Sequence, residues 1–228
     1  MGWIDPVVVY AAPPRLSEPE PRRVWSGTIE DRADSRWELI DTAVSATEFD
    51  LDGCDTLDLD NSTLDGVTFV GGSMASLSLS HSAAIGCDLS GIRFSSLRNV
   101  RLDDCKLVGA EFAGGDLVDV SFLRCVLRLV NLRNVKLRRV QFIDCTLHDV
   151  DAFDLDAEDV SFARSDLEKF NMDRLRARRV DLRATRRLGL TKVTGLNGCL
   201  VEQDQLLALR YQLAFAAGLD IEREPDPD

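Results

Sequence analysis

Residues 115–144 decide the fold, and in groups of five they read GDLVD VSFLR CVLRL VNLRN VKLRR VQFID. The third residue of every group is leucine or phenylalanine, and the first is glycine, cysteine or valine. An α-helix turns 100° per residue, so positions five apart would scatter around it and bury no common face. On an extended segment, however, residues two apart point to the same side. The first and third residues can therefore point inward while the last two turn a corner, so that five residues form one side of a tube.

A second period of twenty residues indicates that the tube has four sides. The column through positions 102, 122, 142, 162 and 182 contains only leucine and phenylalanine, and the column two residues earlier contains only valine. Such columns are expected when successive coils stack at one strand spacing, about 4.8 Å. We therefore predict an all-β solenoid, a right-handed quadrilateral parallel β-helix of about seven coils, followed by a C-terminal α-helix.

The same five-residue phase extends toward the N-terminus with one interruption. Eight residues, not five, separate Phe94 from Leu102. We interpret the additional three as a small bulge within residues 95–99, which would continue the column of Leu59 and Leu79 into Leu102. The predicted β-helix then forms one uninterrupted domain.

The chain divides into four predicted parts. Residues 1–40 form an irregular N-terminal cap or arm, 41–192 the β-helix, 193–219 a C-terminal capping or dimerisation helix, and 220–228 an acidic tail. A solenoid leaves unpaired strand edges at both ends, and these edges invite aggregation unless they are covered. The first part is rich in proline and contains all three tryptophans. It can be a cap laid over the first coil or a flexible partner-binding arm.

The C-terminal part contains a predicted α-helix over residues 202–217, closed by Gly218. Its apolar stripe is too wide for a solitary surface helix. The helix can therefore cap the last coil, form a homodimer interface, or do both. The candidate interface residues are Leu206, Leu207, Leu209, Tyr211, Leu213 and Phe215.

Composition limits the partners. The net charge of −12 argues against direct binding to nucleic acid or to an anionic membrane, because both need basic surface. The charge is uneven: residues 41–97 sum to −8, whereas residues 98–192 sum to +3. No apolar run approaches the roughly 20 residues that span a bilayer, and the first residues lack the pattern of a signal peptide. Six cysteines without a disulfide framework favour a reducing compartment, so we expect a cytoplasmic protein.

No pattern for catalysis, metal binding or a cofactor is recognisable. His81 and His148 fall at outward positions far apart in register, and neither has a nucleophile placed beside it. Cys105, Cys125 and Cys145 should stack in the interior, but they project in parallel and lack a fourth ligand for structural zinc. We predict no catalytic, cofactor-binding or metal-binding residues, no cofactor and no enzymatic activity.

Charged residues alternate in sign at the corners. Asp104, Arg124, Asp144 and Arg164 recur every twenty residues, and a second corner repeats the alternation. Stacked coils would bring opposite charges about one strand spacing apart. The corners should therefore form ion pairs, each contributing about 0.2 to 1 kcal/mol.

The repeats resemble those of the pentapeptide repeat family, whose consensus is A(D/N)LXX. The closest matches are CDLSG at 87–91, AEFAG at 110–114, GDLVD at 115–119 and VNLRN at 130–134. This resemblance implies the quadrilateral β-helix and a binding role rather than chemistry. Some members mimic duplex DNA and bind DNA gyrase or topoisomerase IV, which protects the enzyme from quinolones or related toxins.

Two functions follow from these observations. The first is a non-catalytic protein-interaction module or scaffold whose partner is unknown. The alternative is a DNA-mimicking binder of DNA gyrase or topoisomerase IV. The acidic total and the rod shape favour the alternative, whereas the net positive half next to the C-terminal helix is unlike a mimic that concentrates negative charge at its dimer centre.

Overall fold

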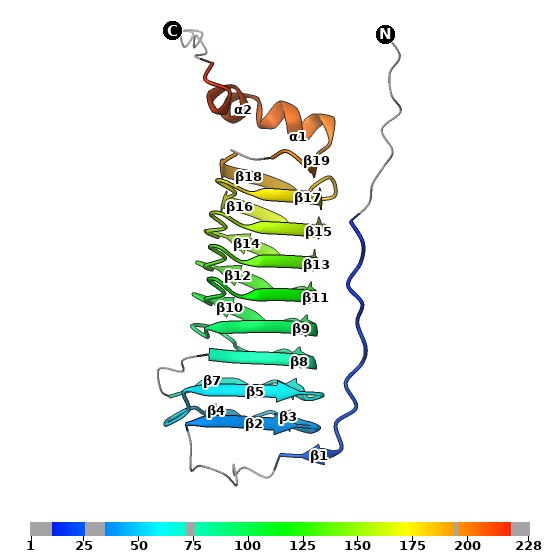
Figure 1. Ribbon diagram of the computed structural model, residues 1–228, viewed down its shortest axis with the longest axis vertical. Helices are drawn as coiled ribbons and strands as arrows, with labels where there is room; N and C mark the ends of the chain where they lie inside the picture. Colours follow the sequence, from blue (N-terminus) through cyan, green and yellow to red (C-terminus); the bar gives the residue numbers. More distant parts are fainter. Residues whose placement is uncertain (1–10, 26–34, 72–75, 194–195, 220–228) are drawn as a thin grey trace.

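The structure, a computed structural model, describes residues 11–25, 35–71, 76–193 and 196–219. It is a rod of stacked coils with two short helices at one end (Figure 1). Every strand pairing among the described residues is parallel. The strands are β1 (Arg23–Val24), β2 (Arg36–Ile40), β3 (Thr42–Ser45), β4 (Glu48–Asp50), β5 (Thr56–Asp60), β6 (Thr63–Asp65), β7 (Thr68–Val70), β8 (Ser76–Ile85), β9 (Phe94–Asp103), β10 (Lys106–Val108), β11 (Asp116–Leu123), β12 (Val126–Arg128), β13 (Lys136–Ile143), β14 (Thr146–His148), β15 (Asp156–Ala163), β16 (Asp166–Asn171), β17 (Arg176–Asp181), β18 (Arg187–Lys192) and β19 (Cys199–Leu200).

The corners of each coil are single residues in the left-handed backbone region. Strand β11 shows the arrangement: Leu117 points inward, the chain bends at Asp119 with φ 56°, and Val120 and Phe122 point inward on the next side. The left-handed region is uncommon for residues other than glycine, asparagine and aspartate. Here even Leu129 adopts it, with φ 55°. The stacked coils therefore impose this conformation at the corners.

The predicted twenty-residue columns are confirmed from β9 to β17. Leu117 pairs in register with Leu137, and the next side places Phe122, Phe142 and Phe162 directly above one another. The three rings are stacked, with centroids 4.7 and 4.9 Å apart and interplanar angles of 6° and 5°. Buried columns of this kind form one continuous core along the rod.

An irregularity lies within the predicted range 95–99, but it adds one residue rather than three. Leu79 pairs with Leu97, and Ala84 pairs with Leu102, so this coil is eighteen residues long rather than twenty-three. The register shift lies at Ser95, where β9 has one residue more than β8 between consecutive pairs. The eight residues between Phe94 and Leu102 are therefore two sides shortened by two residues, not one side lengthened by three.

This change adds one side to the tube, and the solenoid also begins earlier, at β2, and continues through β18. The rod therefore has about eight turns rather than the predicted seven. At about 4.8 Å per turn, its core is roughly 38 Å long. The tight turn before the shortened corner contains Gly91 with φ 72°. Phe94 stacks on Phe112 at 4.6 Å, so the shortened coil still contributes an aromatic ring to the core.

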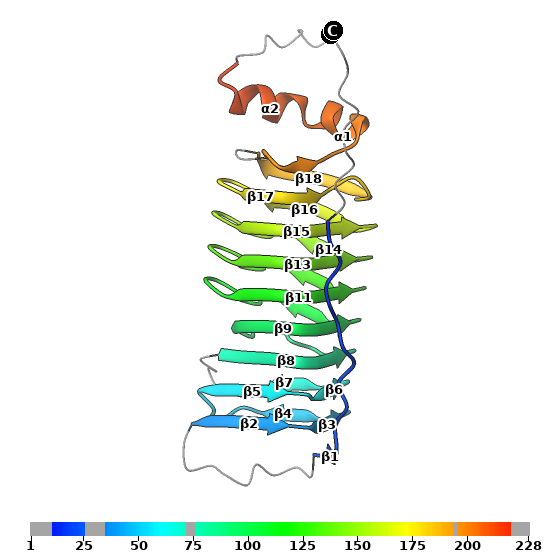
Figure 2. The ribbon, with the colours of Figure 1, turned by 45° about the vertical axis from the view of Figure 1, so that its right-hand side comes forward.

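Residues 11–25 are a strap, and they differ from the predicted N-terminal cap. The strap runs along one corner of the rod from the level of β15 down to β1 (Figures 1 and 2). Only its end caps the first coil, where β1 pairs with β3 and Trp25 stacks on Phe49 at 4.8 Å. The solenoid already begins at β2, inside the part predicted to be irregular. Residues 1–10 and the predicted acidic tail 220–228 lie outside the described residues.

The C-terminal segment covers the other end. It forms two helices, α1 (Gln203–Ala208) and α2 (Arg210–Ala216), rather than the single predicted helix. The helix is interrupted at Leu209, whose side chain is buried against the core. The side chain of Gln205 donates hydrogen bonds to the carbonyl oxygen of Leu182 and to the hydroxyl of Thr185. Helix α1 thus supplies donors to acceptors at the edge of the last coil.

The phenylalanine column predicts a large cost for truncation. Phe142→Ala removes a ring that is stacked on both faces, and we expect a loss of about 3 to 5 kcal/mol in the free energy of unfolding. Thr146→Ala, at an exposed position in β14, should cost less than about 1 kcal/mol. Equal losses of stability for the two variants in chemical denaturation would contradict the observed stacking.

Candidate interaction surfaces

The corners carry the predicted ion pairs. Each arginine reaches back to the aspartate one coil earlier, and both guanidinium donors engage the carboxylate. Three examples are Arg124 with Asp104 at 2.7 Å, Arg139 with Asp119 at 2.6 Å, and Arg164 with Asp144 at 2.7 Å. Within each corner column these contacts are separate pairs rather than an unbroken ladder, and Asp144 has a second contact, with Arg186 at 3.8 Å. Exposed pairs of this kind stabilise weakly, and they neutralise much of the surface in this half of the rod.

The ion pairs also change proton binding. Hydrogen bonds from arginine lower the pKa of Asp104, Asp119, Asp144 and Asp159. Asp159 lies almost buried at its corner, whereas Asp104 is half exposed. The carboxylates therefore stay ionised to lower pH than free aspartate does.

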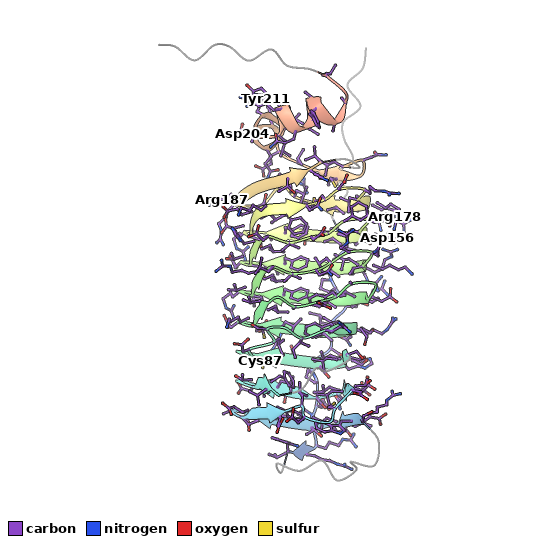
Figure 3. All side chains as sticks on the ribbon, turned by 90° about the vertical axis from the view of Figure 1, so that its left-hand side faces the viewer. Cys87, Asp156, Arg178, Arg187, Asp204 and Tyr211 are labelled. Carbon is purple, nitrogen blue, oxygen red and sulfur yellow. The ribbon has the colours of Figure 1, made fainter. Side chains whose placement is uncertain are left out.

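A column of small side chains lies inside the rod. Cys105, Cys125 and Cys145 stack in register as predicted, and Cys87 precedes them in the same column (Figure 3 shows Cys87). Each thiol donates to backbone carbonyl oxygens, such as Cys125 to Leu102 at 3.3 Å. The described cysteines are free and most are buried, and no group of three metal-ligating side chains occurs among the described residues. The thiols therefore act as small core residues.

The two histidines lie three coils apart, on β8 and β14. His81 contacts Asp60 at 3.1 Å, and His148 contacts Asp149 at 2.9 Å. Each histidine therefore has a carboxylate partner at the surface, and the two histidines do not contact each other.

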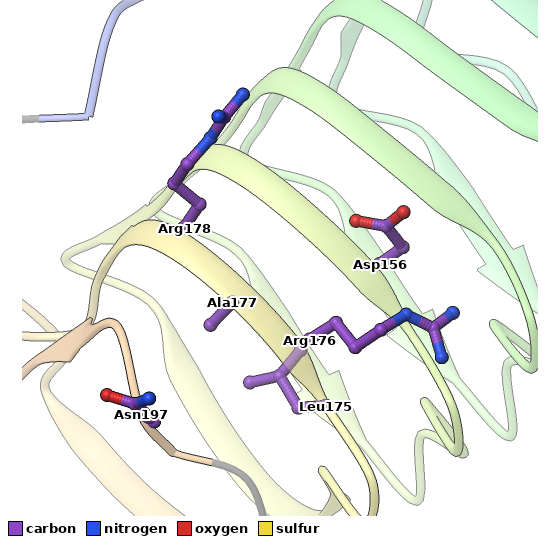
Figure 4. A pocket seen from close by; sticks show the side chains of 6 residues that line it. All are labelled: Asp156, Leu175, Arg176, Ala177, Arg178 and Asn197. Atoms are coloured by element: carbon purple, nitrogen blue, oxygen red, sulfur yellow. The ribbon is translucent and has the colours of Figure 1, made fainter.

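A shallow pocket opens where β17 meets the C-terminal segment. It is lined by Asp156, Leu175, Arg176, Ala177, Arg178 and Asn197. Figure 4 shows the guanidinium groups of Arg176 and Arg178 pointing away from each other. They pair instead with Asp154 and Glu158. Among the lining residues that the structure describes, no polar groups therefore converge to orient a small ligand.

The first coils have a different surface. Residues 41–65 contain eight acidic residues and no lysine or arginine. Arg36 pairs with Asp58 and His81 with Asp60. In the part of the chain that the structure describes, the exposed residues Glu48, Asp55 and Asp65 have no ion pair. We call residues 41–65 the acidic coils, because negative charge there is not neutralised as it is in the ion-paired half.

The structure divides the predicted dimer stripe between two sides of the C-terminal helices. Leu209 is buried and Leu213 packs partly against the rod's core, so both belong to the cap. The others are exposed on the outside: Leu206, Leu207, Tyr211 and Phe215, the last with 82% of its surface accessible. Figure 3 shows Tyr211 above the end of the rod.

Among the described residues, no helix is long and apolar enough to cross a membrane.

The lowered carboxylate pKa values predict an acid-sensitive fold. Because the folded-state pKa lies below the value of about 3.9 in the unfolded chain, the stabilisation is complete above that value and is lost as pH falls through the folded pKa. The melting temperature should therefore stay level from pH 7 to about pH 5 and fall below about pH 4. Arg139→Gln should lower the melting temperature at pH 7 and lessen its fall in acid. A full-sized acid effect in that variant would contradict the ion-pair account.

Part of the chain matches a known family. A sequence model described as "Pentapeptide repeat region" matches residues 95–172. A search of curated sequences found no match. The chain is similar to the solved structure of QnrB1, a plasmid-mediated fluoroquinolone resistance protein, with 16% identity, a TM-score of 0.37, and coverage of 72% of this chain and 90% of that one.

It is also similar to HetL, a pentapeptide repeat protein involved in heterocyst differentiation regulation in the cyanobacterium Nostoc. The identity is 18% and the TM-score 0.37, with coverage of 74% of this chain and 89% of that one. Residues 95–172, which the sequence model matches, contain the five-residue groups from which the fold was predicted. Residues 95–172 thus match the pentapeptide repeat family, and the same left-handed corners continue on both sides of this region.

Proposed function

We propose that this protein is a non-catalytic interaction module that binds a basic surface of a partner protein through its acidic coils. The observation that carries the proposal is the contrast between the two halves of the rod. From residue 98 onward, most corner carboxylates are paired with arginine, whereas residues 41–65 contain no cation of their own. Unneutralised charge on a rigid surface favours and steers binding to an oppositely charged partner.

The shape of the rod supports a protein partner. Its sides are flat sheets rather than clefts, and the described part of the chain has no built small-molecule or metal site. The free thiols favour a reducing compartment, so we propose a cytoplasmic location.

The acidic coils can be tested by neutralisation. Glu48→Gln, Asp55→Asn and Asp65→Asn, combined in one chain, remove three exposed carboxylates that have no described ion pair. We expect a partner captured from the source cell by the unmodified protein to be lost with this variant, and also above roughly 0.5 M salt. Capture is measured by quantitative mass spectrometry.

The matched control neutralises three carboxylates in the other half, by Asp104→Asn, Asp144→Asn and Glu111→Gln. This variant should retain the partner, because these carboxylates are already paired with arginine. Equal retention by both variants, or loss with both while circular dichroism shows folded protein, would contradict the role of the acidic coils.

The second candidate partner is a type II topoisomerase, DNA gyrase or topoisomerase IV. The acidic coils and the narrow rod favour it, since a surface that binds duplex DNA is basic. The position of the charge is against it, because the acidic coils lie at the end of the rod opposite to α1 and α2 (Figure 1). A gyrase supercoiling assay, with and without a quinolone, separates the two candidates: protection by the protein at micromolar concentration supports gyrase, and no effect excludes it.

We also propose that the exposed side of α1 and α2 pairs two rods as a homodimer. Leu207→Glu with Phe215→Glu would place carboxylates in that apolar seam, where burial without a partner is costly. Light scattering should then show half the mass of the unmodified protein, with an unchanged melting temperature. Leu209→Glu should instead lower the melting temperature, because Leu209 belongs to the cap. An unmodified protein that is already monomeric would contradict the dimer.

A further inference from the structure

The strap is bound through its backbone to one column of corner residues. Ala12 N–H donates to Asp159 at 3.1 Å, and Arg15 N–H donates to Asp119 at 2.8 Å. The contacts continue down the rod with Ser17 N–H to Asn99 at 2.8 Å and Glu20 N–H to Asn61 at 2.9 Å. We call Asn61, Asn99, Asp119 and Asp159 the acceptor column.

The spacing of the strap matches the spacing of the coils. A polyproline II segment rises about 3.1 Å per residue, so three residues cover roughly 9 Å. Two coils rise about the same distance, close to 9.6 Å at 4.8 Å each. The donors at 12 and 15, and those at 17 and 20, are three residues apart and contact acceptors two coils apart. The acceptor column therefore fits a peptide in this conformation.

The prolines of the strap avoid the donor positions. Pro13, Pro14 and Pro19 lie between donors and Pro21 follows the last one, so all four occupy positions whose N–H the column does not need. Proline lacks an N–H and favours the polyproline II conformation, so it lowers the entropy cost of binding without removing a contact. The sequence of the strap is thus that of a peptide ligand bound mainly through its backbone, to which Glu18 adds an ion pair with Arg101 at 2.7 Å.

Side chains of the acceptor column recognise the strap in further ways. Asn99 donates to the hydroxyl of Ser17 at 2.6 Å, and Asn61 donates to the carbonyl oxygen of Glu20 at 3.2 Å. Arg139 donates a hydrogen bond to the carboxylate of Asp119 and fixes its orientation. The same carboxylate accepts the hydrogen bond from the Arg15 N–H of the strap. The corner ion pairs thus orient the acceptors.

The strap is held only at the surface. None of residues 11–22 is buried, and the first strap side chain that packs against the core is Trp25. A segment bound by a few surface hydrogen bonds and one ion pair can leave while the rod stays folded.

We propose that the acceptor column is a docking surface for an extended, proline-rich peptide of a partner protein, and that residues 11–22 occupy it in competition with that peptide. The peptide that fits carries backbone N–H groups with the 3-2-3 spacing of positions 12, 15, 17 and 20, and proline elsewhere. Asn61 lies within the acidic coils, but the strap contacts used here do not involve Glu48, Asp55 or Asp65, so this proposal can be tested separately from the neutralised carboxylates.

The test uses the full chain with Arg15→Pro and Ser17→Pro, which remove two of the four donors and weaken the strap. The probe is a fluorescent peptide of residues 11–22, AAPPRLSEPEPR, measured by anisotropy. We expect the peptide to bind this variant at least about tenfold more tightly than it binds a Leu16→Pro control, in which the four donors remain. A control peptide with proline at positions 15 and 17 should not bind.

A second pair of variants locates the binding. Asn61→Gly with Asn99→Gly, added to the weakened strap, keeps the left-handed corners but removes two acceptors, and peptide affinity should fall at least about tenfold. Leu129→Gly, at a left-handed corner of another column, should leave affinity unchanged. Absence of saturable binding to the weakened-strap chain, or equal binding with and without Asn61 and Asn99, would overturn the proposal.

Discussion

The structure depends on a left-handed residue at each corner of a five-residue side. This conformation bends the chain sharply enough to bring the first and third residues of every side inward, and twenty residues then close one turn. It costs free energy for residues such as Leu129 and Arg139, which have no special tolerance for it. The cost is offset by parallel hydrogen bonds to the coils on both sides and by burial of the inward side chains.

The same corners organise the surface. A side chain at a left-handed corner projects from the edge of the rod, directly above the equivalent side chain of the previous coil. Aspartate and arginine at these positions form pairs one coil apart, as Asp119 and Arg139 do. Asparagine and aspartate in one column also present oxygen atoms at multiples of the coil spacing, and an extended peptide can match that spacing. The core and the acceptor column are thus two consequences of one backbone geometry.

Much of this could be predicted from the sequence, since inward residues repeat every five and twenty positions. The length of the shortened coil could not, because the residue count fits two solutions: between Phe94 and Leu102, eight residues equal one side plus three or two sides minus two. The interruption of the C-terminal helix at Leu209 could not be predicted either. An apolar helix face that covers the last coil and one that forms a dimer have the same composition. The strap was missed because its contacts use backbone N–H groups, although the prolines between donors are a signal for it.

The central claim is that corner columns in coil register hold the strap, and site-resolved amide hydrogen exchange tests it most directly. The account predicts slow exchange at Ala12, Arg15, Ser17 and Glu20, whose N–H groups are bonded to the acceptor column. Exchange at Leu16 and Glu18, which lie between these donors, should be close to that of an unstructured peptide. Uniformly fast exchange through residues 12–20, with the core amides still protected, would contradict the account.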